Sequence, residues 1–599
     1  VPSGSVLAIT LAGALPDAPA ALPRFGGASD GAGAPLPVIT GALRAAAHDP
    51  RVKAVYLRVE PLGCGYAKLE ELVRYIGYVR DAGKEVVAWM EMGGEKEYFV
   101  ARHCSEVFVA PEAYLALKGF RVSGTFLRGV LEKVGVEPQV QRIGKYKSAG
   151  DQFNRKDMSE AQREMLTAIL DSQYEKFAEK VAKASGKTPA DVKMLLDQAP
   201  QDMKVLEELG WVNGLKYEDE VVDMLKLKFN RGSDDEAKLK SPLRAVSLKR
   251  YAKVATPRFL GLEGGRYAPR IAVIRAAGAI VSGNGGKASP FSSSSLGDKA
   301  LVRLVKRAAE DKKVDAIVIR VDSPGGSALA SDIMWREISK AAKKKPVIAS
   351  MVDVAASGGY YIAMACDEIV AEELTITGSI GVVTAKLSLG ELYKRIGYAS
   401  ESISRGTYAE LDIDNRTFTP AEDEYFRLGA QRAYTSFVSK AAASRNTTVE
   451  ILQEYAQGRV WTGEQAIARG LVDHIGGLAA AIDRAKLKAG IAPETRIRTV
   501  EYATPKSALS QLAGAAAVVF AGTPFAAALA AVAEGEDVGS VGEGSGMAMG
   551  AGRVEMLAMT DFDGSEVSPV SRYLVEKLSQ RAASAGLDVS GIVRAMLRI

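Results

Sequence analysis

The sequence has 599 residues, of which 47% are hydrophobic and 25% charged, so it predicts a globular chain with several sizeable cores. Its net charge of +5 is small for this length. That charge argues against a nucleic-acid partner and permits only weak attraction to an anionic membrane surface. The three cysteines, Cys64, Cys104 and Cys366, are too few for a disulfide framework or a cysteine-rich zinc site.

The chain opens with a strand-like apolar run at residues 5–11, followed by a loop rich in Gly, Ala and Pro at residues 16–37. A helix should then extend to about His48. The first strong signal is the run VKAVYLRVE at residues 52–60, which is rich in β-branched residues. This run returns later in the chain, at residues 314–322.

An internal duplication organises the sequence. Cys104 pairs with Cys366 at a shift of 262 residues, and the same shift aligns residues 52–149 with the later copy without a gap. Other identical pairs are Arg58 with Arg320, Tyr98 with Tyr360, Gly119 with Gly381, Gly135 with Gly397 and Tyr146 with Tyr408. Two copies of one structural unit are therefore expected, and their chemistry can be compared within one chain.

Two glycine-rich turns follow successive strands in the second copy. A strand that starts at Ala316 halts at DSPGG (residues 322–326), and a helical pattern comes next. A second strand runs into AASGGY (residues 355–360), which places Ser357 at a strand-to-helix turn walled by Ala and Gly. A serine at such a turn either projects its hydroxyl into a cleft or caps the following helix.

Together with TGSIG at residues 377–381, these motifs resemble the S49 signal peptide peptidase family, also called protease IV. The resemblance implies an α/β fold of two tandem repeats similar to Clp protease and crotonase, with extra helices and a C-terminal extension. It also implies a serine endopeptidase with a Ser/Lys dyad that degrades signal peptides and other apolar, extended peptides at a membrane. By the same resemblance, we expect a homo-tetramer and no metal or nucleotide cofactor.

The two copies differ where this chemistry is expected. The first copy has Glu95 at the position of the predicted nucleophile Ser357, and the second copy has Ala409 at the position of Lys147. The segment GKYKSA at residues 144–149 resembles the one that bears the general base in full-length S49 peptidases, which assigns that role to Lys147. Each copy therefore holds a catalytic group that the other lacks.

Lys145 is a rival for the role of base, because residues two apart in an extended segment lie on the same face. The motif favours Lys147. Either lysine must be neutral to accept the proton of a serine hydroxyl. Lowering the pKa of a lysine from about 10.4 to about 7.5 costs roughly 4 kcal/mol, which burial beside apolar groups can supply.

An oxyanion needs two N–H donors, and the N–H of Gly358, next to the nucleophile, is the first candidate. The second should come from Gly325 or Gly326, a choice that the sequence leaves open. Ser379 resembles the family serine that orients the lysine amine, although it could equally be a structural turn residue. Two acidic residues near the turns, Asp322 and Asp353, are interpreted as turn or cap residues rather than catalytic acids.

The sequence divides into four segments. Residues 1–235 form an N-terminal repeat that supplies the lysine, 236–269 a linker, 270–495 a C-terminal repeat that supplies the serine, and 496–599 an extension of unknown role. Within the extension, Ala508 to Ala533 carries no charge and could contact or enter a bilayer, although Gly and Pro interrupt it.

Two other functions remain open at this level. A crotonase-like acyl-CoA enzyme would also place N–H donors after these strands, and a catalytically inactive, membrane-associated scaffold would need neither Ser357 nor Lys147. For location, the resemblance implies a membrane-associated protein. That membrane would be the plastid thylakoid in a photosynthetic eukaryote and the inner membrane in a bacterium.

Overall fold

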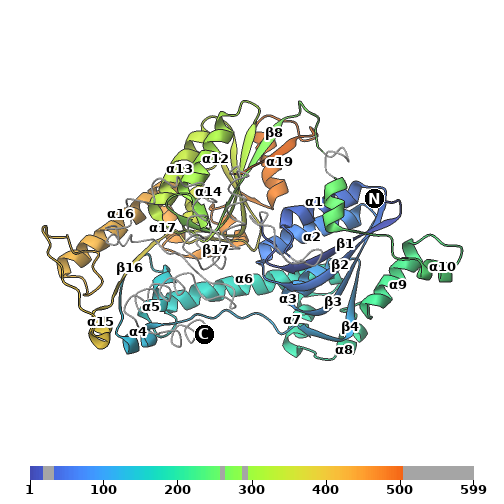
Figure 1. The fold of residues 1–599 in the computed structure, drawn as a ribbon, viewed down its shortest axis with the longest axis horizontal. Helices are drawn as coiled ribbons and strands as arrows, with labels where there is room; N and C mark the ends of the chain where they lie inside the picture. The colour runs from blue at the N-terminus through green and yellow to red at the C-terminus, as the bar shows by residue number, and fades with distance from the viewer. Residues whose placement is uncertain (18–32, 256–262, 287–294, 504–599) are drawn as a thin grey trace, which may run out of the picture.

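A computed structural model describes residues 1–17, 33–255, 263–286 and 295–503 (Figure 1). It contains two α/β units, which we call the first repeat (residues 1–255) and the second repeat (residues 263–503). Each unit has a largely parallel sheet with helices on both faces. The predicted α/β fold with two tandem copies is confirmed.

The first repeat builds its sheet from strands that alternate with helices. Its elements are β1 (Ser5–Gly13), α1 (Leu36–His48), β2 (Val52–Leu62), α2 (Tyr66–Asp81), β3 (Glu85–Gly94), α3 (Glu95–Arg102), β4 (Glu106–Ala116), α4 (Arg128–Val134), β5 (Glu137–Ile143), the 3₁₀ turn Ser148–Gly150, α5 (Asp151–Asn154), α6 (Glu160–Ser185), α7 (Pro189–Gln198), α8 (Met203–Glu208), β6 (Gly214–Leu215), α9 (Glu218–Phe229), α10 (Asp235–Lys240), β7 (Ala245–Ser247) and α11 (Leu248–Val254). The strand order is β6-β4-β3-β2-β1-β7, and neighbouring strands are parallel. Strand β2 is buried over most of its length because helices cover both faces of the sheet, which explains its apolar sequence.

The second repeat follows the same plan. Its elements are β8 (Arg270–Ala277), β9 (Ala279–Val281), β10 (Gly285–Gly286), β11 (Ser295–Gly297), α12 (Asp298–Glu310), β12 (Ala316–Ser323), α13 (Ala328–Ala342), β13 (Val347–Ala356), α14 (Gly358–Ala363), β14 (Glu368–Ala371), β15 (Ile376–Gly378), β16 (Val382–Ser388), α15 (Gly390–Ile396), α16 (Pro420–Ser444), α17 (Val449–Tyr455), β17 (Val460–Thr462), α18 (Gly463–Ile467), β18 (His474–Ile475), α19 (Leu478–Lys488) and β19 (Arg498–Tyr502). The main strand order is β17-β15-β13-β12-β8-β19, with β14 and β18 beside β13. Strands β12 and β13 are the counterparts of β2 and β3, so the nucleophile turn follows an inner strand.

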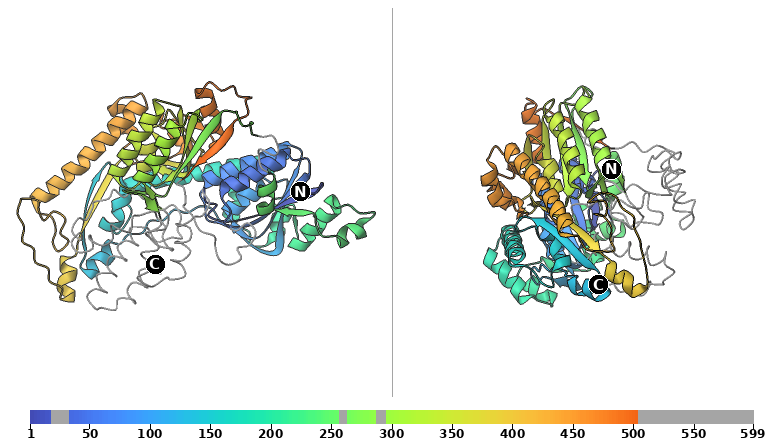
Figure 2. Two further views of the ribbon diagram at one scale, coloured as in Figure 1. Left: turned by 45° about the horizontal axis from the view of Figure 1, so that its top comes forward. Right: turned by 90° about the vertical axis from the view of Figure 1, so that its left-hand side faces the viewer.

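Strands β5 and β16, with the neighbouring helices α4 and α15, form an arm that joins the two units. Strand β5 of the first repeat pairs antiparallel with β16 of the second, and Ile143 lies opposite Val382. Helices α4 and α15 lie at the far end of this arm, away from the first sheet (Figures 1 and 2). The arm thus carries chain from the first repeat to the edge of the second sheet.

Helix α6 also crosses between the repeats (Figure 1). Ser159 caps its start by accepting a hydrogen bond from the N–H of Gln162 at 3.3 Å, and Gly186 ends it in the left-handed conformation. Along its length, Ser172 Oγ lies 3.0 Å from Thr462 Oγ1 on β17. The helix therefore presents one side to the second sheet.

Charged side chains connect the repeats more directly. Asp353, near the end of β13, accepts hydrogen bonds from the N–H groups of Gly65 and Lys68 at 2.8 and 3.0 Å. It thereby caps α2 of the other repeat. Lys68 Nζ lies 3.0 Å from Asp322 and 3.2 Å from Asp353, and the buried Arg320 pairs with two carboxylates of the first repeat. Asp353 thus has the cap role expected from the sequence, whereas Asp322 lies within β12, pairs with Lys68 and accepts a hydrogen bond from the N–H of Val354 at 3.2 Å.

The structure differs from the sequence interpretation at the segment boundaries. Residues 236–269, interpreted as a linker, contain β7, which pairs with β1, and α11, whose Tyr251 is fully buried in the first core. Strand β19 extends the second repeat to Tyr502 by pairing with β8. The predicted membrane-contacting run at residues 508–533 lies outside the described residues.

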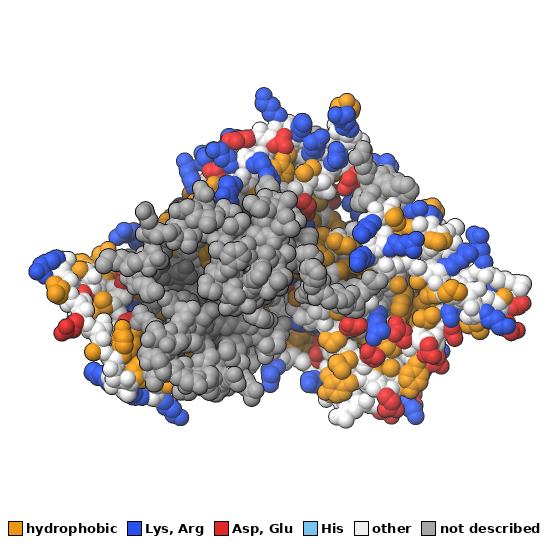
Figure 3. Space-filling model, in the orientation of Figure 1, with side chains coloured by type: hydrophobic (Ala, Val, Ile, Leu, Met, Phe, Trp, Pro, Cys, Tyr) orange, Lys and Arg blue, Asp and Glu red, His pale blue; other side chains and the backbone are white. Residues whose placement is uncertain are grey.

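Charge and hydropathy on the described surface are mixed. Figure 3 shows basic and acidic side chains interspersed over the described part of one face, in keeping with the small net charge of +5. Within the described ranges, no helix combines the length and apolarity that crossing a bilayer requires.

Candidate active site

Ser357 occupies a strained turn between β13 and α14. Its φ of 53° is rare for a residue with a side chain, and its own N–H donates to Gly378 O at 2.9 Å. The following Gly359 packs so closely that a Cβ there would lie 2.4 Å from Ser323 O. Although Ser357 is at the N-cap position of α14, its Oγ contacts Lys147 and makes no capping hydrogen bond to that helix. The turn therefore presents the hydroxyl to the lysine amine.

The DSPGG turn lies against this serine. A Cβ on Gly325 would come within 2.6 Å of Gly358 N, and one on Gly326 within 2.2 Å of Ile280 O, so neither position has room for a side chain. The N–H of Gly325 donates to Ser323 Oγ at 3.2 Å. Within the described part of the chain, the N–H groups of Gly326 and Gly358 have no acceptor. These two amides are thus available to a ligand.

The arm delivers Lys147 to the serine. Because β5 pairs with β16 in a fixed register, the residues after Ile143 run beside the residues that precede Val382. The lysine segment then packs on a turn of the second repeat: Tyr146 N–H donates to Gln457 O at 2.8 Å, and a Cβ on Gly458 would lie 2.5 Å from Lys147 Cβ. Backbone contacts between the repeats therefore set the position of the lysine.

The Lys147 amine has three oxygen neighbours. Its Nζ lies 3.1 Å from Ser357 Oγ, 3.0 Å from Ser379 Oγ and 3.1 Å from the Ser379 carbonyl. A neutral amine has two N–H donors and one lone pair. It can therefore donate to the two Ser379 oxygens and accept the proton of the Ser357 hydroxyl.

Burial tunes this amine. Lys147 is 2% exposed, and desolvation lowers the pKa of its amine from the usual 10.5 to about 7. Its three oxygen neighbours carry no formal charge, so none of them supplies a counter-charge that would restore the pKa. A substantial fraction of the amine is thus neutral near pH 7.

The structure separates Lys147 from its rival. The side chain of Lys145 is 58% exposed, and its Nζ lies 3.1 Å from Tyr146 OH and 3.6 Å from Glu164. The hydrogen bond with Tyr146 and the charge of Glu164 raise the pKa of Lys145. Of the two lysines, Lys147 is the one in contact with Ser357.

Ser379 is positioned by its own backbone. Its φ is 52°, and its N–H donates to Arg459 O at 2.7 Å, beside the turn on which the lysine segment packs. Hence the structure places the six residues singled out from the sequence around one site, with Lys147 in contact with Ser357 and Ser379, and Gly325 packed against Ser357 and Gly358. The N–H of Gly325 already has an acceptor, whereas Gly326, which packs against Ile280, keeps its N–H available.

Comparison with known proteins identifies the family. The family model for Peptidase family S49 matches residues 79–230 and 339–492, together just over half of the chain. The chain belongs to peptidase family S49. The two matched regions fall in the two repeats, so the family membership covers the duplication as well as the fold.

Curated relatives of this S49 peptidase are proteases. Serine protease SPPA, chloroplastic, of Arabidopsis thaliana is 46% identical over 86% of this chain and 73% of its own length. Protease 4 of Salmonella typhi is 31% identical over 75% of this chain and 72% of its own length. The protein is thus a serine-type peptidase. A solved structure of the 1510-N membrane-bound stomatin-specific protease covers 40% of this chain and 99% of its own at 18% identity, but its TM-score of 0.25 is too low to carry an argument.

In the first repeat of the S49 peptidase, carboxylate side chains occupy the turn that is equivalent to the Ser357 turn. Glu95 replaces the serine, and one of its carboxylate oxygens accepts from the N–H groups of Lys118 and Gly119 at 2.8 Å each. Glu97 accepts from the N–H groups of Leu62 and Gly94 at 2.6 and 2.7 Å. Carboxylates therefore hold backbone N–H groups around this turn of the first repeat, whereas at the equivalent turn of the second repeat the serine hydroxyl contacts the lysine amine.

Sequence reasoning missed the partners of residues that contact one another across long stretches of sequence. The capping of α2 by Asp353 and the contact of Arg459 O with Ser379 N–H both join segments far apart in sequence. Neither residue lies in a motif that predicts its partner. Ser323, in contrast, lies within DSPGG, and its Oγ fixes the turn by accepting from Gly325 N–H, so the motif itself carried that signal.

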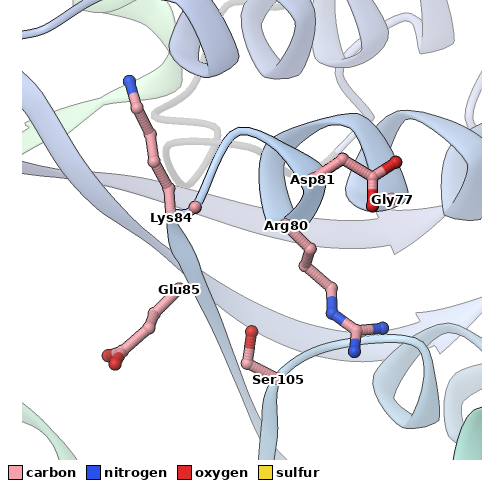
Figure 4. A pocket seen from close by; sticks show the side chains of 7 residues that line it. Gly77, Arg80, Asp81, Lys84, Glu85 and Ser105 are labelled. Atoms are coloured by element: carbon pink, nitrogen blue, oxygen red, sulfur yellow. The ribbon is translucent and has the colours of Figure 1, made fainter.

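A second hollow of about 440 Å³ lies at the C-terminal end of α2, the end remote from Asp353. Figure 4 shows its charged side chains diverging from one another. Lys84 Nζ donates to the carbonyls of Ala46 and Asp49, and Arg80 donates to His103 O at 2.9 Å. Its lysine and arginine are therefore engaged with backbone, in contrast to the groups that converge on Ser357.

Proposed function

We propose that this S49 peptidase is a serine endopeptidase in which Ser357 is the nucleophile and Lys147 the general base. One observation carries the proposal: the buried Lys147 amine lies 3.1 Å from Ser357 Oγ, within hydrogen-bonding reach of the proton it would remove. The lowered pKa of about 7 supports the proposal, because a base must be unprotonated at the working pH.

The proposed reaction has two stages. Lys147 takes the hydroxyl proton as Ser357 Oγ bonds to the carbonyl carbon of the scissile peptide. The N–H groups of Gly358 and Gly326 donate to the resulting oxyanion. The Lys147 ammonium then gives its proton to the departing amine, which leaves an acyl-enzyme, and water activated by the neutral amine hydrolyses that ester. Ser379 orients the amine throughout.

Single substitutions test the dyad. Ser357→Ala and Lys147→Ala should each remove nearly all peptidase activity, and the double variant should be little worse because members of one catalytic unit are not additive. Lys145→Ala is the matched control, since that side chain is exposed and does not contact Ser357. A Lys147→Ala enzyme with more than about a tenth of normal activity, beside an inactive Lys145→Ala enzyme, would overturn the assignment of the base.

Labelling by a serine-reactive phosphonate supplies a readout that does not depend on the substrate. The probe should modify Ser357 in the unaltered enzyme and should leave Ser357→Ala unmodified. Failure to label a folded enzyme at Ser357 would contradict the nucleophile assignment, whatever peptide is offered.

The proposal extends to substrates and setting. We propose that the substrates are signal peptides and other apolar, extended peptides, in line with an Enterococcus faecium relative named as a signal peptide peptidase. We also propose a membrane-associated location in a plastid, at the thylakoid, supported by the chloroplastic relative. Fractionation of isolated thylakoids, with and without a high-salt wash, tests peripheral attachment.

We propose a homo-tetramer as the assembled form. Exposed apolar side chains on and after α15, among them Ile396, Tyr398 and Ile403, are suited to a contact between copies. Light scattering after size-exclusion chromatography should give four times the chain mass. A monomer at micromolar concentration would refute this part of the proposal.

A further inference from the structure

A small pocket adjoins the catalytic pair. Its lining includes the polar side chains of Tyr146, Lys147, Ser148 and Ser379 and the apolar side chains of Met165, Pro324, Val354 and Val460. Because Lys147 Nζ contacts Ser357 Oγ, a substrate bonded to that oxygen has the mouth of this pocket beside it. The pocket is thus placed to receive a side chain next to the scissile bond.

Two apolar side chains from different repeats help to close the pocket. Met165 lies on α6 of the first repeat and is 1% exposed, whereas Val460 lies on β17 of the second repeat and is 2% exposed. The two side chains belong to one buried cluster with Ile169. Met165 Sδ also accepts the N–H of Val460 at 3.3 Å, so the thioether lies across the start of β17. Met165 therefore takes part both in the contact between the repeats and in the wall of the pocket.

The free space in this pocket is small. Its volume of about 10 Å³ is near the minimum that holds one water molecule. A methyl group is of similar size, whereas a leucine or phenylalanine side chain needs Met165 or Val460 to move. Both residues are packed in a closed core, where added volume forces neighbouring side chains out of their preferred positions.

The side chain most dependent on such a pocket belongs to the residue that supplies the scissile carbonyl. That residue stays bonded to Ser357 through the acyl-enzyme stage, whereas the amine on the other side of the scissile bond must leave. A pocket with an apolar wall can hold the side chain of the acyl residue through both stages. If it held the residue on the amine side instead, it would slow release of that product. The apolar part of this lining, which includes Met165, Val354 and Val460, also disfavours a charged side chain at this position.

We propose that this pocket receives the side chain of the residue supplying the scissile carbonyl, and that Met165 limits that residue to small ones such as alanine. The inference rests on the proposed function, because it takes Ser357 as the nucleophile. It adds to that function a size limit set from the first repeat. The chain's first repeat thus contributes specificity as well as the catalytic lysine.

A matched peptide series tests the size limit in the unaltered enzyme. The peptides share one apolar, extended sequence and differ only in one residue, which is glycine, alanine, valine, leucine or phenylalanine. Cleavage sites are mapped by mass spectrometry, and kcat/KM is measured for the bond that follows the varied residue. Alanine should exceed leucine and phenylalanine by at least ~10-fold, the lower end of what a pocket gains by excluding extra methylene groups.

Two core variants then separate pocket size from stability. Met165→Ala removes the wall and should lower the alanine-to-leucine ratio by ~10-fold or more. Ile169→Ala is the control, because Ile169 lies one turn along the same helix in the same buried cluster but does not line the pocket. It should leave the ratio unchanged. If Met165→Ala does not fold, Val460→Ala opens the same wall from the other repeat and should lower the ratio in the same direction.

The outcomes distinguish this inference from the function on which it rests. Cleavage that depends on Ser357 but favours leucine or phenylalanine as much as alanine would overturn the size limit and leave the dyad intact. A ratio unchanged in both pocket variants, or a size preference on the far side of the scissile bond, would also overturn it. An enzyme that cleaves no peptide of the series and is not labelled at Ser357 would overturn the proposed function and the size limit together.

Discussion

Replacing Lys147 with methionine should abolish activity and stabilise the fold. The amine is fully desolvated, and its pKa falls from 10.5 to about 7. A change of this size corresponds to a cost of about 5 kcal/mol for holding the charged amine in the folded protein. Methionine has a similar length and no charge, so Lys147→Met removes this cost along with the base. In the proposed mechanism, the enzyme therefore gives up stability at the residue that acts as its base.

The stabilisation by Lys147→Met should depend on pH in one direction. The folded protein binds the Lys147 proton more weakly than the unfolded chain does, so between pH 7 and 10.5 only the unfolded chain holds that proton. Over this window the contribution of Lys147 to the free energy of unfolding rises with pH. Below pH 7 both states are protonated and the folded state bears the full cost. The advantage of Lys147→Met should thus be greatest at or below pH 7 and should shrink towards pH 10.

The net effect is smaller than the full desolvation cost. In the variant, Ser357 Oγ and Ser379 Oγ lose a hydrogen-bond partner, which costs about 1–3 kcal/mol. We therefore expect a net gain of about 2–4 kcal/mol at pH 7. For a cooperative folding unit of the size of one repeat, that gain corresponds to a rise of roughly 5–15 °C in the apparent melting temperature.

Differential scanning fluorimetry of the two proteins at pH 6, 7, 8 and 9 measures this effect. Lys145→Met is the control, because its side chain is exposed and should change neither activity nor melting temperature. A Lys147→Met protein that melts at or below the temperature of the unaltered protein at pH 7 would show that the amine is not buried as described. So would a difference in melting temperature that does not shrink as the pH rises.

Three further outcomes are expected. The kcat/KM of the unaltered enzyme should rise with pH to a plateau with a midpoint near 7, and a rise only above pH ~10 would contradict a buried base. Ser379→Ala should lower the rate and move that midpoint to lower pH, because the lost hydroxyl accepts a hydrogen bond from the charged Lys147 amine. Glu95→Ser combined with Ser357→Ala should stay inactive and unlabelled by the phosphonate, because the second repeat has Ala409 at the position equivalent to Lys147. Labelling at residue 95 would show that the two repeats are functionally equivalent. Asp353→Ala removes the cap on α2, which costs about 0.5–2 kcal/mol of stability, and should lower the apparent melting temperature by a few degrees. Asp353→Asn should lower the melting temperature less. Equal melting temperatures of the two variants and the unaltered protein in scanning fluorimetry would refute a capping role.

The sequence predicted the pair Ser357 and Lys147 because its two copies can be compared position by position. Glycine-rich turns after apolar strands predicted where the serine lies, and the absence of a lysine at Ala409 indicated which copy supplies the base. The structure adds the distance of 3.1 Å between the two side chains and the strained φ of Ser357. These depend on packing and could not be predicted from residue types.

Other features escaped the sequence because they arise between repeats. Strand β5 of the first repeat pairs with β16 of the second, and the equivalent segments of the two repeats do not form such a pair. No local sequence pattern therefore predicts this pairing. The helical pattern after DSPGG, which predicted α13, consists of Leu329, Ile333, Met334 and Ile338. Of these, Leu329 is 58% and Ile333 40% exposed, whereas the other two are buried. Apolar spacing predicted the helix but not which of its apolar residues face solvent. The supposed linker was misread because its polar composition hid the short strand β7.

The ladder between β5 and β16 also sets when the enzyme can first act. Lys147 leaves the ribosome 210 residues before Ser357, and at ~5–20 residues per second this delay is roughly 10–40 s. In the proposed mechanism, a nascent chain during that interval has a base without a nucleophile. Even after Ser357 has emerged, the lysine has no fixed place until β16 and the Gln457 turn have been made and have docked against β5. If Ser357 and Lys147 act as proposed, a partly synthesised or truncated chain cannot cut its neighbours, and proteolysis begins only once both repeats have folded together.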